Sequence, residues 1–132
     1  YKNPTEELKI IEDFYLLIQK DSSKKILITE YSFFSALLKE SLHSPSRTYD
    51  NISYPMPNDS KFEIYYKFFK KNIIKNKIEN IYIFFTSLDI TTDELNHFVF
   101  NYLPKNCYDL KHLSIYTKKI KLNKCDYLIN EN

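Results

Sequence analysis

Three side chains with complementary chemistry lie close together in the stretch Ser44–Pro57, SPSRTYDNISYPMP. Arg47 offers a planar, two-pronged hydrogen-bond donor, Tyr49 an aromatic surface and Asp50 a carboxylate, a combination that suits a sugar or an anionic group. Arg47 is the only arginine, whereas lysine supplies every other fixed positive side-chain charge, which favours a site that needs a planar donor. The alternative is a loop that an internal Arg47 ion pair and a buried tyrosine hold to its own domain.

The only two cysteines, Cys107 and Cys125, lie on either side of His112. A zinc site would need a fourth ligand, and the spacing matches none of the usual zinc patterns, so we predict no metal site. A Cys–His nucleophile has no further support in the sequence. In an oxidising compartment the two cysteines could form a disulfide, and the sequence leaves open whether they do.

Composition excludes several classes of function. With 132 residues the chain fits one domain, and its formal net charge of +2 is far from that of a protein that neutralises a nucleic-acid backbone. The chain has no glycine, so neither a GxGxxG loop nor a P-loop can be present. We therefore predict no nucleic-acid partner and no cofactor. Apolar runs such as Ile81–Phe85 are too short to span a bilayer, so we expect a soluble segment.

Three short apolar runs predict strands. Residues 25–30 (KILITE) and 80–86 (NIYIFFT) are rich in isoleucine and aromatic residues, which is typical of buried parallel strands. Residues 112–117 (HLSIYT) alternate between polar and apolar types and predict a third strand. Residues 120–129 fit no single pattern.

Helices are predicted between these strands. Asn3, Pro4 and Glu6 form a helix start, and the apolar period continues toward Asp21. Capping residues predict further helix starts at Ser32, Ser60 and Thr91, and Pro104 ends the last of these helices. Helices alternating with strands predict a three-layer α/β/α sandwich around a mostly parallel sheet, Rossmann-like but without a glycine-rich loop.

Binding sites on such sheets lie beyond the carboxyl ends of the strands. Glu30 and Tyr31 follow the first predicted strand, and Ser87 and Asp89 follow the second. The stretch Ser44–Pro57 has to return across the domain to this edge, because the next helix precedes a strand. We therefore expect Arg47, Tyr49 and Asp50 to lie near Glu30, and these seven residues form the predicted ligand site.

The segments ILITEYSFFSALL, SPSRTYDNISYPMP and YYKFFKKNIIKNKIENIYIF together resemble the soluble C-terminal region of bacterial multi-spanning membrane proteins of the dolichyl-phosphate-mannose and aminoarabinose transferase type. The resemblance covers residues 26–84 best. It departs from the family pattern at Glu30, where we would expect aspartate, and at Thr48, where we would expect tryptophan. Glu30 is itself a predicted ligand contact, and Thr48 lies between two others, Arg47 and Tyr49.

The resemblance implies that residues 1–132 are one soluble domain of a longer membrane protein, facing the extracytoplasmic side, where Cys107 and Cys125 would be oxidised. Its partners would be the transmembrane part of its own chain and a glycan or polyprenyl-phosphate sugar. Such a domain would position a glycan or lipid-linked sugar without catalysis of its own. The alternatives are a free-standing α/β hydrolase or phosphotransferase that uses Glu30, Ser87 or Asp89, and a purely structural interaction domain.

Overall fold

Two buried strands, β1 (Lys25–Thr29) and β2 (Asn80–Phe84), pair in parallel in the computed structural model, which describes residues 3–43, 55–86 and 101–129. Their register runs from Lys25 opposite Asn80 to Thr29 opposite Phe84. Every residue of the pair except Thr29 is buried, as the continuous apolar runs predict. The α/β class and these two strands are confirmed, and the pair has the carboxyl edge on which the predicted site depends.

The predicted third strand is wrong, and so is the mostly parallel sheet. Residues 113–116 form the turn of a hairpin between β3 (Tyr108–His112) and β4 (Thr117–Leu122). Because β4 pairs antiparallel with β2, the sheet is mixed and has the order β1-β2-β4-β3. The alternating apolar residues of HLSIYT belong to the turn, where Ser114 Oγ accepts a hydrogen bond from the Tyr116 amide.

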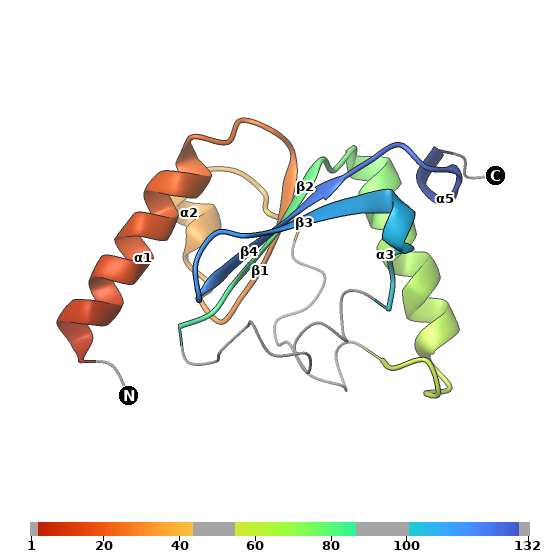
Figure 1. The fold of residues 1–132 in the computed structure, drawn as a ribbon, viewed down its shortest axis with the longest axis horizontal. Coiled ribbons are helices and arrows are strands. Elements are labelled where there is room, and N and C mark those ends of the chain that lie inside the picture. The colour runs from red at the N-terminus through yellow and green to blue at the C-terminus, as the bar shows by residue number, and fades with distance from the viewer. Residues whose placement is uncertain (1–2, 44–54, 87–100, 130–132) are drawn as a thin grey trace.

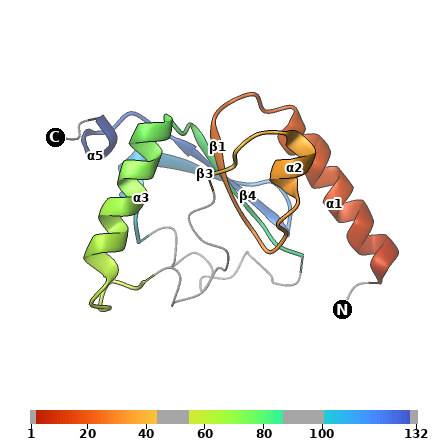
Figure 2. The same cartoon turned by 180° about the vertical axis from the view of Figure 1, so that it is seen from behind.

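Helices pack against both faces of this sheet (Figures 1 and 2). Helices α1 (Pro4–Gln19) and α2 (Phe34–Leu38) cover one face, and α3 (Phe62–Asn76) covers the other. Alternate residues of β2 contribute to two hydrophobic cores, one on each face of the sheet. The core under α1 and α2 consists of Phe14, Ile18, Leu27, Phe34, Leu42, Tyr82 and Phe84. The core under α3 consists of Ile26, Ile28, Phe69, Ile73, Ile78, Ile81, Ile83, Phe85, Tyr102, Leu103 and Ile120. In the described part of the chain, no helix has the length and apolar character of a membrane span.

The helix starts follow the predicted capping signals to different degrees. Asn3 caps α1 as predicted, because its Oδ1 accepts a hydrogen bond from the Glu6 amide at 2.9 Å and Pro4 occupies the first turn. Helix α2 begins after Phe33 with no side-chain cap from Ser32. Helix α3 begins after Lys61, one residue later than the Ser60 box predicts, with no side-chain cap on its own N-cap residue.

The C-terminal segment, unassigned from sequence, contains the second half of β4 and a short helix, α5 (Asp126–Ile129). The 3-10 helix η1 (Lys105–Cys107) precedes β3, and a disulfide joins Cys107 to Cys125 with 5.4 Å between their Cα atoms. It closes a loop of 18 residues around the hairpin, for which the chain-entropy treatment gives a stabilisation of about 3 kcal/mol. The predicted helix beginning at Thr91 lies outside the described residues, except for residues 101 and 102, which form a turn.

Without glycine, the chain uses other residues where the backbone turns left-handed. Lys39 (φ 56°) ends α2 and Lys77 (φ 54°) ends α3, both in the left-handed region that usually favours glycine. At Lys77 the two closing bonds run from its own amide to Ile74 O and from the Ile78 amide to Ile73 O. This is the Schellman geometry, in which a Cβ atom costs about 1 kcal/mol.

We therefore expect Lys77→Gly to raise the free energy of unfolding by about 0.5 to 1 kcal/mol, because glycine removes that strain at slight entropic cost. Lys75→Gly is the matched control, since Lys75 lies in the last regular turn of α3 and glycine there should cost about 1 kcal/mol. Urea unfolding of the two variants and the wild type measures both effects. Equal destabilisation by both substitutions would contradict the strain at Lys77.

Candidate functional site at the carboxyl ends of the parallel strands

Glu30 links the ends of β1 and β2. Its Oε2 accepts a hydrogen bond from the Thr86 amide at 2.7 Å and contacts Thr86 Oγ1 at 3.4 Å. Thr86 is buried and lies two residues beyond the end of β2. The carboxylate therefore satisfies a backbone group that the end of the sheet would leave exposed.

The Tyr31 hydroxyl joins this edge to helix α1. It donates a hydrogen bond to Glu7 Oε2 at 2.5 Å and also lies 2.5 Å from Thr86 Oγ1. Since a phenol has one proton, the Thr86 hydroxyl is the donor in the second contact when Glu7 accepts the first. The Tyr31 ring packs beside Phe33, Phe34 and Phe84.

Burial raises the pKa of Tyr31 to about 12, and the hydrogen bond to the Glu7 carboxylate acts in the same direction. The nearby charge of Glu30 adds a smaller effect of the same sign. At neutral pH the phenol therefore keeps its proton. Tyr31 can serve this edge as a hydrogen-bond donor but not as a general base.

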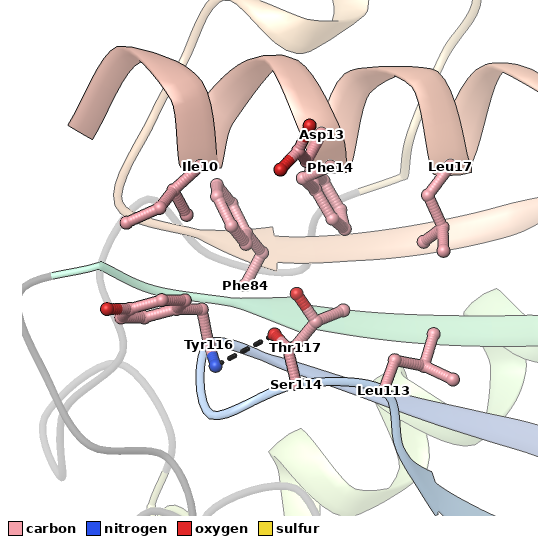
Figure 3. A pocket seen from close by; sticks show the side chains of 9 residues that line it. All are labelled: Ile10, Asp13, Phe14, Leu17, Phe84, Leu113, Ser114, Tyr116 and Thr117. Carbon is pink, nitrogen blue, oxygen red and sulfur yellow. Dashed lines mark hydrogen bonds between the residues drawn. The ribbon is translucent and has the colours of Figure 1, made fainter. Parts of the chain in front are cut away.

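A groove of about 300 Å³ lies beside this edge, between α1 and the hairpin turn (Figure 3). The turn is fixed to the end of β2, because the Phe85 amide donates to Tyr116 O at 3.1 Å. Asp13, the only carboxylate of the groove, is paired with Lys9 at 2.6 Å. The lining of the groove is mostly apolar with three hydroxyls, and consists of Ile10, Asp13, Phe14, Leu17, Phe84, Leu113, Ser114, Tyr116 and Thr117.

A second hollow continues from this groove toward the start of α1. It shares Ile10 and Tyr116 with the groove, so both residues stand between the two hollows. Its other lining residues are polar, namely Asn3, Thr5, Glu6 and Lys9. An elongated ligand could therefore contact apolar side chains at one end and hydrogen-bonding groups at the other.

Of the seven predicted ligand contacts, the structure brings Glu30 and Tyr31 together, through Thr86. The other five, Arg47, Tyr49, Asp50, Ser87 and Asp89, lie outside the described residues. Of the stretch Ser44–Pro57 only residues 55–57 are described, and there Pro55 O accepts a hydrogen bond from the buried Tyr102 hydroxyl at 2.7 Å.

Sequence reasoning missed Glu7, Thr86 and the turn residue Tyr116. Thr86 could have been found, because it ends the predicted strand 80–86. Glu7 could have been suspected as well, because a helix that leads into a parallel strand begins near the carboxyl edge. Tyr116 gave no such signal, since its segment was predicted to be a strand.

The opposite end of the strand pair carries a second polar cluster. Asp21 accepts hydrogen bonds from Asn80 Nδ2 at 3.1 Å and from the Tyr82 hydroxyl at 2.6 Å. Burial opposes the charged form of Asp21, but the hydrogen bonds from Ser23 and Tyr82 outweigh it and hold the pKa of this carboxyl below its usual value. Nearby, the buried Lys25 ammonium is paired with Glu40 at 3.2 Å. These contacts fix the turn after α1 to the sheet. The buried Oδ1 of Asn80 has no hydrogen-bond partner in the described part of the chain.

Two kinds of catalytic group, a metal cluster and a cysteine nucleophile, are absent from the residues that the structure describes. No group of three His, Cys, Asp or Glu side chains suited to a metal occurs in residues 3–43, 55–86 and 101–129. The disulfide occupies both thiols, which removes the thiolate that a Cys–His nucleophile requires. Comparison with protein-family models, curated proteins and solved structures gives no match to this chain.

We expect Tyr31→Phe to lower the free energy of unfolding by about 1 kcal/mol, because Glu7 and Thr86 lose a shared hydrogen-bond partner. Tyr15→Phe is the matched control, because the Tyr15 hydroxyl only accepts a long hydrogen bond of 3.4 Å from Gln19 on the same helix. Thermal or urea unfolding at neutral pH measures the difference. An equal effect of both substitutions would rule out the bridging role of Tyr31.

The same residue predicts a pH dependence. The folded state raises the pKa of Tyr31 above its ordinary value of 10.0 to about 12, so the folded state binds this proton more tightly. Its contribution to stability is complete below pH 10 and is lost as the pH rises toward 12. A phenolate absorbance titration should show one late-ionising tyrosine fewer in Tyr31→Phe than in the wild type.

Proposed function

We propose that this chain is an accessory extracytoplasmic domain of a bacterial membrane-bound glycosyltransferase-like protein. In this role it helps to bind or position a glycan or lipid-linked sugar and does not catalyse transfer alone. The observation that carries the proposal is the groove beside the carboxyl ends of β1 and β2, together with the adjoining hollow. The groove combines apolar and aromatic walls with hydroxyls and one carboxylate, and the hollow adds polar side chains.

The composition of the groove suits a sugar ring. The half-buried Tyr116 supplies aromatic surface, against which the C–H face of a sugar can pack. Ser114 and Thr117 supply hydroxyls, and the second hollow adds Asn3 and Thr5. A hydroxyl-rich ligand would find donors and acceptors at the rim and an apolar surface at the base, as in most small-molecule sites.

The disulfide supports the proposed compartment. A bond between Cys107 and Cys125 persists in oxidising surroundings such as the bacterial periplasm or cell surface. The proposed partner is the transmembrane part of the same parent protein, in keeping with the family resemblance. We further propose that the fold is a Rossmann-like three-layer sandwich, which the helices on both faces of the sheet support.

The alternative of a free-standing hydrolase or phosphotransferase gains no support from the described residues. Glu30, its described candidate, is hydrogen-bonded to the Thr86 amide and serves the end of the sheet. Ser87 and Asp89 lie outside the described residues.

The groove predicts glycan binding that depends on Tyr116. We expect the chain to bind glycans on an array and mannose oligosaccharides in solution, and Tyr116→Ser to weaken this binding by about tenfold through loss of ring contact. Tyr15→Ser is the matched control, because Tyr15 is a half-buried tyrosine of α1 outside both hollows. Thermal melts establish that both variants fold. Absence of glycan binding by the wild type, or equal weakening in both variants, would contradict the groove as the binding site.

The proposed setting has a separate test in the gene itself. We expect the complete reading frame to encode about ten hydrophobic spans upstream of Tyr1, each of roughly 18 or more apolar residues. A start codon immediately before Tyr1 would exclude the membrane-bound parent, whatever the result of the glycan titration.

A further inference from the structure

The turn of the β3–β4 hairpin exposes large apolar side chains. Turns usually present small or polar residues to solvent. Here Leu113 is 40% exposed and Ile115 is 60% exposed, and Tyr116 beside them is half-buried. Exposed apolar side chains gathered at one turn indicate a contact surface.

Hydrogen bonds fix this turn from both sides. The Leu113 amide donates to Thr117 O at 2.9 Å, and the Tyr116 amide donates to Ser114 Oγ at 3.0 Å. The amide of Phe85, the residue after β2, donates a hydrogen bond to Tyr116 O. The apolar side chains are therefore presented in a defined geometry, so a partner would not have to order the turn on binding.

The strands behind the turn are basic. The hairpin Tyr108–Leu122 contains four lysines and one carboxylate, Asp109, for a net charge of +3 against +2 for the whole chain. The remainder of the chain is thus slightly acidic. Lys111 and Lys121 are exposed and Lys119 is partly exposed, whereas Lys118 is buried.

The carboxylate that lines the groove beside the turn does not cancel the positive charge of the hairpin. Asp13 lines the groove beside Leu113 but is paired with Lys9. The other acidic side chains of α1, Glu6, Glu7 and Glu12, lie on the helix across the groove. The basic surface therefore belongs to the hairpin and not to the side of the groove that α1 forms.

We propose that residues 113–116 insert into the interface of an anionic lipid bilayer, with the exposed hairpin lysines against the lipid headgroups. The order of these side chains matches the layers of such an interface. The aliphatic side chains of the turn would contact the acyl chains, Tyr116 the boundary, and the lysines the headgroups. An apolar protein groove would account for Leu113 and Ile115 but not for the lysines. This contact goes beyond the proposed function, since it requires no glycan.

The absence of tryptophan from the chain permits a direct test. Ile115→Trp introduces a single tryptophan at the turn, and Ile64→Trp places one at a 74% exposed isoleucine of α3 as the control. We expect vesicles of phosphatidylcholine with phosphatidylglycerol to shift the emission of the first variant to the blue and to quench it when the lipids are brominated. The control should show neither change, and added salt should weaken the effect by screening the lysines.

Sedimentation with the same vesicles measures the contribution of the native side chain. Ile115→Ser should lower the partition coefficient roughly fivefold to tenfold through loss of buried apolar area, whereas Ile64→Ser should leave it unchanged. If vesicles leave the fluorescence emission of Ile115→Trp unchanged, the proposal is overturned. This result is expected if the partner of the turn is a protein. Equal effects of the two serine variants, or equal binding to vesicles of phosphatidylcholine alone, would also overturn the proposal. Glycan titrations without vesicles test the groove independently.

Discussion

The parallel pairing of β1 with β2 is the constraint on which the rest of the structure depends. Both strands are buried, so each face of the pair requires a cover of apolar side chains. Alternate residues of β2 meet this requirement, with Tyr82 and Phe84 against α1 and α2 and Ile81 and Ile83 against α3. A parallel pair also needs a long connection between its strands, and here that connection includes α2 and α3.

Parallel pairing also places polar requirements at both ends of the strands. Beyond Phe84 the Thr86 amide donates a hydrogen bond to Glu30 Oε2. At the other end Asp21 accepts from Asn80 and Tyr82. Since the chain has no glycine, Lys39, His43 and Lys77 adopt the positive φ for which other sequences often use glycine. The polar residues at the carboxyl edge therefore have a structural role first, and Tyr31 extends that role to α1 through Glu7.

Local signals predicted the parts of the fold that local physics determines. The apolar runs at 25–30 and 80–86 predicted buried strands because both faces of those strands are covered. The Asn3 cap predicted the start of α1 because capping involves only neighbouring residues. The hairpin could not be predicted in this way, since Leu113 and Ile115 continue the alternation of the strands through the turn. Whether such residues face a core or solvent depends on β4 pairing with β2, about 37 residues earlier in the chain.

The candidate site also has a part that the sequence predicts and a part that it does not. Glu30 and Tyr31 could be placed at the carboxyl edge by topology alone, whereas the groove arises where α1 meets a turn about a hundred residues later. This position connects the two proposals. The turn forms one wall of the groove, with Leu113 and Tyr116, and Ile115 lies between them in the sequence. Insertion of that turn into a bilayer would bring the groove to the headgroup region, which is where the sugar of a lipid-linked donor lies. A free glycan would gain nothing from this placement, so membrane contact through the turn favours the lipid-linked form as the ligand.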